Sequence, residues 1–338
     1  MARGLFELRK DSVTGWWVAV VVDREFNRER FEKPAQHRDD PGESCANCSA
    51  PGTDGVRIRI LKPDAFIVAG TEREQREAQP DGRDPELGIV GDAGSWQTIV
   101  APRGHHESFA ETTPQIAFEL LARARDVLTE ARQAEKTDYL QIVQNYGLQA
   151  GALTDHLCFD FYDLPQIPHR IGEELGGAAR YVIREGICPF CRLVRDEVAD
   201  PKRLVFEDSA SVAFAPYASR SPFELWVVPR HHAADFGTAT DAQLVSAADT
   251  LQRVLQMLGT LGGPAYNLVL HSAPLRERVD ETYHWHWEIH PRLSEIAGLE
   301  LGTGLPVNPV SPEDAVAHLL ASAREAGEPI LARAAEWQ

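Results

Sequence analysis

The sequence is short of positive charge, of cysteine and of long apolar runs. It has 34 lysines and arginines against 51 aspartates and glutamates, a formal net charge of -17. This acidic balance argues against a protein that binds nucleic acid phosphates over a broad surface. No stretch of about 18 apolar residues predicts a membrane span, and the first residues show no apolar run typical of a signal peptide. We therefore expect a cytoplasmic protein that binds neither nucleic acid nor membrane.

Only five of the 338 residues are cysteines, and four of these form two Cys-x-x-Cys pairs. The pairs are Cys45 with Cys48, and Cys188 with Cys191. In a reducing compartment, paired cysteines are more often metal ligands than disulfides. The alternatives are two buried thiols for the first pair and a redox pair for the second.

The histidines and cysteines occur in the same order in both halves of the chain, which indicates an internal repeat. The first half contains, in order, Cys45, Cys48, His106, His156 and Cys158. The second half contains, in order, Cys188, Cys191, His232, His284 and His286. The two inner histidines are 50 residues apart in the first half (106 to 156) and 52 in the second (232 to 284). This agreement predicts two related units, residues 1–178 and 179–338.

The sequence pattern of each half predicts an antiparallel sheet with a helix packed on it. Thr113-Pro114 and Thr240-Asp241 are helix start signals, and each is followed by apolar residues at helical spacing. Val245 belongs to the apolar set of the second helix. Runs rich in β-branched and apolar residues predict strands over residues 140–144, 207–215, 223–228 and 266–271. The fold class is therefore α+β.

Each half can also assemble a metal site. Two cysteines and two histidines suit tetrahedral zinc, and four protein ligands leave no open position, so the expected role is structural. The first set is Cys45, Cys48, His106 and His156, and its mirror image is Cys188, Cys191, His232 and His284. A separate second-half site for zinc or iron could use harder ligands, namely Glu174, His271, His284 and His286. His284 cannot serve both second-half sites fully, so this choice stays open.

These motifs, together with several longer segments, resemble the galactose-1-phosphate uridylyltransferase family, a duplicated branch of the histidine-triad superfamily. The similarity spans nearly the whole chain and includes residues 7–18, 104–107, 145–152, 214–224, 283–286 and 296–304. The resemblance implies two histidine-triad-like repeats, a homodimer, and transfer of a nucleoside monophosphate between a sugar nucleotide and a sugar 1-phosphate. In that family a neutral histidine attacks the α-phosphorus and forms a covalent nucleotidyl-enzyme.

The segment that should carry this nucleophile departs from the family pattern. The family motif is His-Pro-His-x-Gln, whereas the chain reads His156-Leu157-Cys158-Phe159-Asp160. Cys158 stands at the nucleophile position, and Asp160 replaces a glutamine that donates to phosphate, although a carboxylate accepts hydrogen bonds and repels phosphate. Cys158 is either a thiolate nucleophile or, as we favour, a small buried residue at an inactive site.

The second half retains a run of alternating histidines, which the first half lacks. The run from His284 to His290 alternates, so His284, His286, Glu288 and His290 should share one face of a strand. Simple histidine-triad enzymes use the middle histidine of such a run as nucleophile, which makes His286 the second catalytic candidate. In the duplicated family this half usually binds metal and substrate, so we favour a metal ligand for His286. The intervening tryptophans, 285 and 287, should pack in the core.

The resemblance finally implies a set of substrate-binding residues, some of which match or lie beside the family's sugar-binding loop. They are Asn145, Gly151, Asp160, Glu300, Gly302, Thr303, Gly304 and Asn308. Because most of the segments that carry the family resemblance are retained, we predict a nucleotidyltransferase that acts on a sugar nucleotide and a sugar phosphate. The alternatives are a catalytically inactive protein that binds zinc and a nucleotide, and a hydrolase or phosphorylase that uses water or phosphate as acceptor.

Overall fold

A computed structural model describes residues 6–22, 28–37, 57–60, 95–105 and 108–327. Three of the four ligands expected for the first zinc site, Cys45, Cys48 and His106, lie outside these ranges. Within them, no helix combines the length and the apolar character that crossing a bilayer requires.

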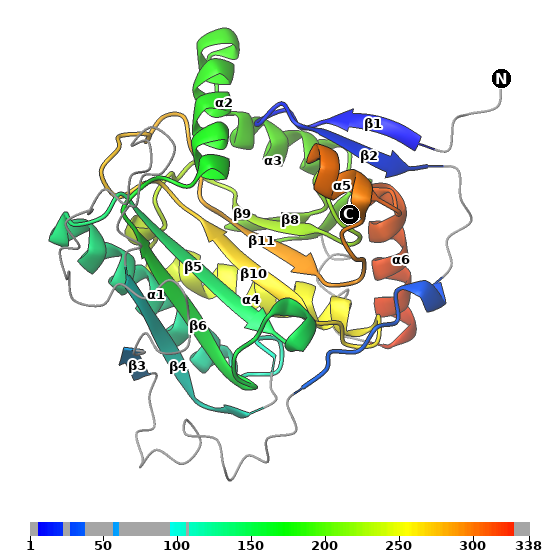
Figure 1. Cartoon of the computed structure of the whole chain (residues 1–338), viewed down its shortest axis with the longest axis horizontal. Coiled ribbons are helices and arrows are strands. Elements are labelled where there is room, and N and C mark those ends of the chain that lie inside the picture. Colours follow the sequence, from blue (N-terminus) through cyan, green and yellow to red (C-terminus); the bar gives the residue numbers. More distant parts are fainter. Residues whose placement is uncertain (1–5, 23–27, 38–56, 61–94, 106–107, 328–338) are drawn as a thin grey trace, which may run out of the picture.

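One antiparallel sheet of nine strands runs through both halves of the chain (Figure 1). Its spatial order is β3-β4-β6-β5-β10-β11-β9-β8-β7. The strands of the first half are β3 (Arg57–Ile60), β4 (Ser95–His105), β5 (Tyr139–Tyr146) and β6 (His156–Leu164). Those of the second half are β7 (Leu204–Glu207), β8 (Ser211–Phe214), β9 (Leu225–Pro229), β10 (Tyr266–His271) and β11 (His286–Pro291). The two predicted antiparallel sheets are therefore joined edge to edge where β5 pairs with β10.

The β5–β10 pair lies at the centre of an internal two-fold arrangement. On one side follow β6 and β4, and on the other side follow β11 and β9. Val143 lies opposite Val269 across the centre, Asp160 lies opposite Val143, and Glu288 lies opposite Val269. Asp160 and Glu288 thus hold equivalent places in the two halves. The division of the chain at residue 178 stays a prediction, and it falls within a helix, α2 (His169–Glu185).

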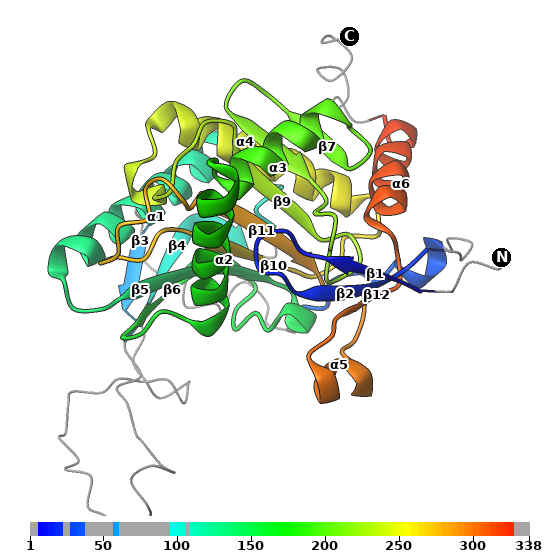
Figure 2. The ribbon, with the colours of Figure 1, turned by 90° about the horizontal axis from the view of Figure 1, so that it is seen from above.

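Helices cover both faces of the sheet, as Figures 1 and 2 show. The helices α1 (Pro114–Ala134) and α4 (Asp241–Gly259) share one apolar core with alternate residues of the strands, among them Phe159 and Trp287. On the opposite face, α2 and α3 (Pro189–Ala199) form a second core with Trp226 and Tyr283. Because neighbouring strand residues point to opposite faces, Cys158, His286 and Glu288 lie on the side of α2 and α3.

The predicted helix starts are confirmed. The side chain of Thr113 accepts a hydrogen bond from the Ile116 N–H, with Pro114 in the first turn. Thr240 and Gln243 form a capping box at the start of α4, which satisfies N–H groups that a helix end leaves unpaired. One residue of the predicted apolar face is misplaced, because Val245 is 54% exposed.

The strand predicted over residues 207–215 is shorter in the structure, where β8 covers Ser211–Phe214 and Glu207 ends the preceding strand, β7, which pairs with β8. The turn between them is made by Asp208, whose Oδ1 accepts the backbone N–H groups of Ala210 and Ser211, both at 2.7 Å. An aspartate that binds the backbone two and three residues ahead favours a turn over a strand. The tryptophans 285 and 287 are buried in the core as predicted.

A smaller sheet lies across the α2–α3 side of the molecule. It consists of β1 (Phe6–Lys10), β2 (Trp17–Val21) and β12 (Val307–Asn308), in the order β1-β2-β12. The remaining elements are α5 (Gly298–Thr303), α6 (Pro312–Glu325) and the 3-10 turns Arg28–Arg30, Leu148–Ala150 and Phe236–Thr238. The turn between β1 and β2 rests directly on α2, where the Val13 carbonyl oxygen would lie 1.8 Å from a Cβ placed on Gly177.

This close approach predicts that Gly177→Ala destabilises the protein by about 1–3 kcal/mol, since either the hairpin or the helix has to shift. Gly172 lies on the same helix with nothing within 4 Å of a Cβ. Gly172→Ala should therefore be neutral or stabilising by up to about 1 kcal/mol. Urea unfolding of both variants measures the difference, and equal stabilities would contradict the packing of the hairpin on α2.

Candidate active site and metal centres

A buried carboxylate, Glu288 on β11, gathers charged groups from three parts of the chain. Arg170 Nη2 lies 2.7 and 2.6 Å from its two oxygens. Arg220 Nη2 and His290 Nε2 each lie 3.0 Å from Oε2. Burial alone would raise the pKa of Glu288, but Arg220 and His271 hold it well below its usual range. A fully buried carboxylate is tolerable only with such partners.

His286, the neighbour of Glu288 on the same strand face, presents one ring nitrogen without a partner. Its Nδ1 lies 3.0 Å from the carbonyl oxygen of His284, which fixes the N–H on that atom. Its Nε2 is buried, has no hydrogen-bond partner among the described residues, and lies 3.9 Å from Glu288 Oε1. Burial and the nearby charge of His271 lower the pKa of His286 to about 4, so the ring is neutral at neutral pH.

His271 completes this cluster from the adjacent strand β10. Its Nδ1 lies 3.0 Å from Glu174 Oε2, which also accepts a hydrogen bond from the Tyr283 hydroxyl at 2.8 Å. Burial opposes protonation, but the carboxylates of Glu174 and Glu288 outweigh it and raise the pKa of His271 to about 9. Ligand atoms of Glu174, His271, His286 and Glu288 all lie within 4.8 Å of one another. Two carboxylates and two imidazoles suit a divalent cation, although Glu288 is already compensated by two arginines.

A second group, Cys188, Cys191, His232 and His284, also brings four ligand atoms within 4.8 Å of one another. Cys191 Sγ lies 3.2 Å from His232 Nδ1 and 3.6 Å from His284 Nδ1. The opposite nitrogens face carbonyl oxygens, since His284 Nε2 lies 3.0 Å from Pro229 O and His232 Nε2 lies 2.5 Å from Asp280 O. Such carbonyl contacts orient metal-binding imidazoles, and the Cys₂His₂ set fits tetrahedral zinc.

The hydrogen bond between the Cys188 and Cys191 thiols shifts their pKa values in opposite directions. It raises the pKa of Cys188, with burial acting in the same direction. It lowers the pKa of Cys191 to about 4, and His284 and His232 add to this effect. A thiolate beside two imidazoles is the form of the site that binds a metal. In the structure His284 lies with the two cysteines and His232, whereas Glu288 lies beside Glu174, His271 and His286.

The first half has a matching strand with different side chains. His156 Nε2 lies 2.8 Å from Ala101 O, as His284 does from Pro229 O. Cys158 is buried. Asp160 accepts hydrogen bonds from Thr98 Oγ1 at 2.8 Å and Trp96 Nε1 at 3.3 Å. Burial raises the pKa of Asp160 despite these donors.

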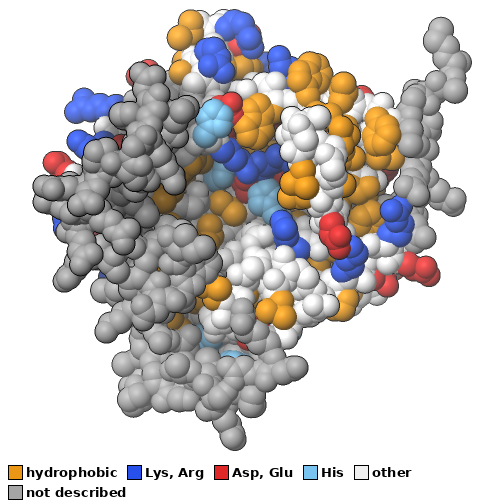
Figure 3. All heavy atoms as spheres, viewed as in Figure 1, with side chains coloured by type: hydrophobic (Ala, Val, Ile, Leu, Met, Phe, Trp, Pro, Cys, Tyr) orange, Lys and Arg blue, Asp and Glu red, His pale blue; other side chains and the backbone are white. Residues whose placement is uncertain are grey.

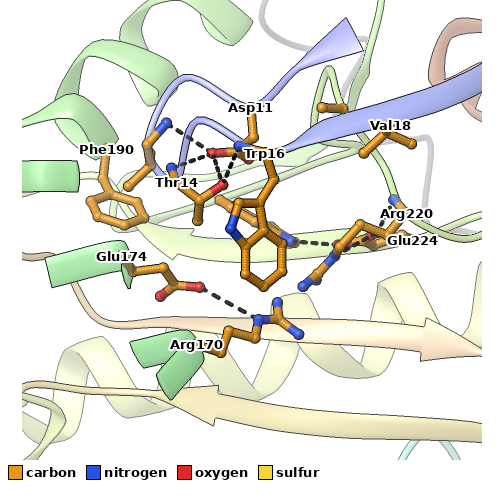
Figure 4. Close-up of a pocket in the computed structure, with 12 residues that line it drawn as sticks. Asp11, Thr14, Trp16, Val18, Arg170, Glu174, Phe190, Arg220 and Glu224 are labelled. Carbon is orange, nitrogen blue, oxygen red and sulfur yellow. Dashed lines mark hydrogen bonds and ion pairs between the residues drawn. The ribbon is translucent and has the colours of Figure 1, made fainter. Parts of the chain in front are cut away.

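Two cavities meet at the two arginines that bind Glu288. A cavity of about 630 Å³ is lined by Arg170, Arg220, Asn267, His290 and Arg292 together with residues of the α5 segment. A smaller cavity of about 20 Å³ is lined by the same two arginines and by Trp16, Glu174, Phe190 and Trp226 (Figure 4). Figure 3 shows basic and histidine side chains gathered in a hollow of the face that carries α2 and α5. A large cavity of this size is typical of small-ligand sites.

The predicted substrate-binding residues fall into three groups. Glu300 and Gly304 line the larger cavity, and Gly302 and Thr303 lie on the same short helix. Asn145 Oδ1 accepts a hydrogen bond at 2.6 Å from Asn267, which lines that cavity.

Gly151 and Asn308 occupy structural positions. Gly151 ends a 3-10 turn with φ +78. The amide of Asn308 donates to the carbonyl oxygens of Ser219 and Ser221 at 3.0 and 3.1 Å, so its donors hold the backbone together.

The sequence pattern does not single out Arg170, Arg220 and Arg292 as site residues. Arg220 lies in the segment 214–224 that carries the family resemblance, so a signal existed there. Arg170 is a helix residue 118 positions before Glu288, and nothing local in the sequence connects the two. Their roles depend on contacts that only the folded chain creates.

Comparison with known proteins gives a consistent result. ADP-glucose phosphorylase of Arabidopsis thaliana is 28% identical over 326 residues, which cover 91% of this chain and 90% of that protein. Galactose-1-phosphate uridylyltransferase of Thermotoga maritima is 27% identical over 206 residues, 58% of this chain and 63% of that protein. A crystal structure of the Arabidopsis phosphorylase with bound ADP-glucose aligns with a TM-score of 0.73 at 27% identity, covering 93% of this chain and 98% of that one. A scan of protein-family profiles finds no match.

Over nearly its whole length the chain is similar to a galactose-1-phosphate uridylyltransferase-like protein of Arabidopsis thaliana, and over more than half of it to a galactose-1-phosphate uridylyltransferase. The predicted resemblance to this family is thereby confirmed, and so is the α+β fold of antiparallel sheet and packed helices. The departure predicted from the motif falls on β6, which carries Cys158 and Asp160.

The charge cluster predicts that Glu288→Gln destabilises the protein by about 3 kcal/mol, because Arg170 and Arg220 lose a buried counter-charge. Glu295 lines the larger cavity but is exposed, so Glu295→Gln should change stability by less than about 0.5 kcal/mol. Guanidinium unfolding of the two variants provides the measurement. Similar small effects for both would show that Glu288 does not anchor the cluster.

Proposed function

We propose that this chain transfers a nucleoside monophosphate from a sugar nucleotide to a phosphate-bearing acceptor. The observation that carries the proposal is the cavity of about 630 Å³ that is lined by His290 of β11 and by Arg170, Arg220 and Arg292. Arginine clusters of this kind bind phosphate groups through charge-assisted, often bidentate hydrogen bonds. They stand out in a chain of net charge -17.

The size and lining of the cavity support a sugar nucleotide as donor. A cavity of about 630 Å³ is within the range of small-molecule sites. The α5 segment, with Glu300 and Gly304, would face the sugar, while the arginines would face the diphosphate. The fixed positive groups would stabilise the charge that develops on the phosphoryl oxygens during transfer.

Orthophosphate is a second candidate acceptor beside a sugar 1-phosphate. The similarity to a phosphorylase of ADP-glucose extends over 91% of the chain, whereas the similarity to the Thermotoga uridylyltransferase extends over 58%. In our proposal the donor is therefore ADP-glucose or UDP-glucose. Orthophosphate attack would release a nucleoside diphosphate, and sugar phosphate attack would release a new sugar nucleotide. A homodimer remains our expectation.

We further propose zinc in both Cys₂His₂ sets. The second set is described above, and its donors fit zinc in kind and in spacing. The first set would combine His156 with the expected ligands Cys45, Cys48 and His106. In each half a histidine Nε2 lies close to a backbone carbonyl oxygen, at 2.8 Å for His156 and 3.0 Å for His284. This shared contact supports the same metal-binding role for the two histidines.

The activity is tested by incubating zinc-replete protein with ADP-glucose or UDP-glucose, with either orthophosphate or galactose 1-phosphate present. Exchange products would indicate a transferase, nucleoside diphosphate a phosphorylase, and nucleoside monophosphate a hydrolase. Arg170→Gln should lower kcat/KM by roughly 10- to 100-fold, whereas Arg180→Gln, an exposed site on the same helix, should not change it. No turnover with either donor would favour the inactive nucleotide-binding alternative.

The zinc proposal is tested by metal analysis of purified variants. Cys191→Ser should lose about one zinc ion per chain, since a tetrahedral site needs all four ligands. Cys158→Ser, which changes a cysteine outside the proposed sets, should keep the zinc content of the unmodified protein. Equal zinc in the two variants would contradict a metal at Cys188, Cys191, His232 and His284.

A further inference from the structure

A row of polar side chains crosses three neighbouring strands at the larger cavity. Asn145 of β5 lies opposite Asn267 of β10, and Asn267 lies opposite His290 of β11. Residues directly opposite each other in a sheet present their side chains on the same face. Asn267 and His290 both line the cavity, so this row borders the space that the arginines and the α5 segment also line.

Hydrogen bonds fix the orientation of the Asn267 side-chain amide. Its Nδ2 donates to the carbonyl oxygen of Ala150 at 2.7 Å and to Asn145 Oδ1 at 2.6 Å. A backbone carbonyl oxygen only accepts hydrogen bonds, so the Asn267 atom beside Ala150 is the nitrogen and not the oxygen. Both hydrogens of that nitrogen are then used, and the amide oxygen is the atom of this side chain that stays available to a ligand.

The chemistry of this oxygen suits a hydroxyl group of a phosphate-bearing ligand. Asn267 is half-buried at the cavity, and its amide carries no charge. A carboxylate at this place would repel the phosphates that the arginines attract, whereas an amide oxygen accepts a hydrogen bond without that repulsion. The site therefore offers a neutral acceptor of fixed orientation next to groups that attract phosphate.

The position of Asn267 relative to the arginines favours a sugar over a base as its partner. His290 Nε2 lies 3.5 Å from Arg220 Nη2, and side chains opposite one another in an antiparallel sheet are about 4.5–5.5 Å apart at Cβ. In a sugar nucleotide both sugars are attached directly to the diphosphate, whereas the base is attached to the far side of the ribose. A ligand whose phosphate lies beside Arg220 therefore brings a sugar hydroxyl close to Asn267.

We infer that Asn267 is a substrate-binding residue whose amide oxygen accepts a hydrogen bond from a sugar hydroxyl of the bound sugar nucleotide. The inference rests on the proposed function and adds the residue that selects a hydroxylated ligand. The hydroxyl belongs to the ribose or to the hexose, since both adjoin the diphosphate. A ligand that lacks this hydroxyl would cover the oxygen without pairing it, and an acceptor left unpaired on burial costs free energy.

Asn145 and the turn before Gly151 are positioning residues for this contact. Asn145 supplies the oxygen that accepts one N–H of Asn267. The 3-10 turn Leu148–Ala150 supplies the carbonyl oxygen of Ala150, which accepts the other. Gly151 ends this turn with φ +78, a conformation that glycine adopts without strain. Two of the predicted substrate-binding residues thus act on the ligand through Asn267.

Direct binding tests the inference without any turnover. Isothermal titration calorimetry measures the Kd of ADP-glucose, of UDP-glucose and of analogues that lack one ribose or one hexose hydroxyl, with the full-length, zinc-replete protein. We expect one of these deoxy analogues to bind the wild-type protein about 3- to 10-fold more weakly than its parent, as for the loss of one neutral hydrogen bond. Asn267→Ala should bind the parent and this analogue with equal affinity, because the acceptor is gone.

The ratio of the two Kd values separates a direct contact from a structural effect. Distortion of the cavity would weaken the parent and the analogue by the same factor and leave their ratio unchanged. Gln141→Ala is the matched control, because the Gln141 amide also joins β5 to β10, by donating to the Leu270 carbonyl oxygen at 2.9 Å, but lines neither cavity. This variant should keep the wild-type ratio. An effect of a ribose analogue assigns the hydroxyl to the nucleoside, and an effect of a hexose analogue assigns it to the hexose.

Three results would overturn the inference: a wild-type ratio that persists in Asn267→Ala, wild-type protein that binds every deoxy analogue as tightly as its parent, or no binding of either sugar nucleotide. Turnover assays with ADP-glucose and UDP-glucose separate it from the proposed function. Discrimination that is lost in Asn267→Ala, without turnover of either donor, would support the role of Asn267 and refute the proposed reaction. Turnover with unchanged discrimination in Asn267→Ala would support the reaction and refute the role of Asn267.

Discussion

The pairing of β5 with β10 joins two repeats into one sheet, and the arrangement of the site depends on it. Through this pairing, equivalent strands β6 and β11 present their polar residues on the same side. Their apolar residues, such as Phe159 and Trp287, fill the core under α1 and α4. A shift of one residue in either strand would exchange the two sets of side chains. The large buried aromatic residues therefore fix the register that places His286 and Glu288.

Charge balance then separates the two halves of this shared face. In the second half a buried glutamate is surrounded by two arginines and two histidines within 3.5 Å. In the first half the equivalent aspartate accepts hydrogen bonds from a hydroxyl and an indole. The same fold thus offers one phosphate-attracting environment and one that lacks these arginines.

The sequence predicts the features that depend on order and periodicity. The repeated cysteines and histidines, the helix starts at Thr113 and Thr240, and the shared face of His286 and Glu288 all follow from local spacing. It could not predict that His284 would join the cysteines, because both candidate sets had suitable ligand types. It also gave no sign that Arg170 would reach Glu288 across 118 positions. The packing of α2 on the sheet brings these two residues together. Local sequence patterns carry no information about that packing.

The central claim is that a sugar nucleotide binds in the cavity lined by Arg170, Arg220 and Arg292, and a crystal structure of the zinc-replete protein with bound ADP-glucose tests it most directly. The account predicts the diphosphate beside Arg170 and Arg220 and the sugar beside the α5 segment. A diphosphate bound outside this cavity would contradict it.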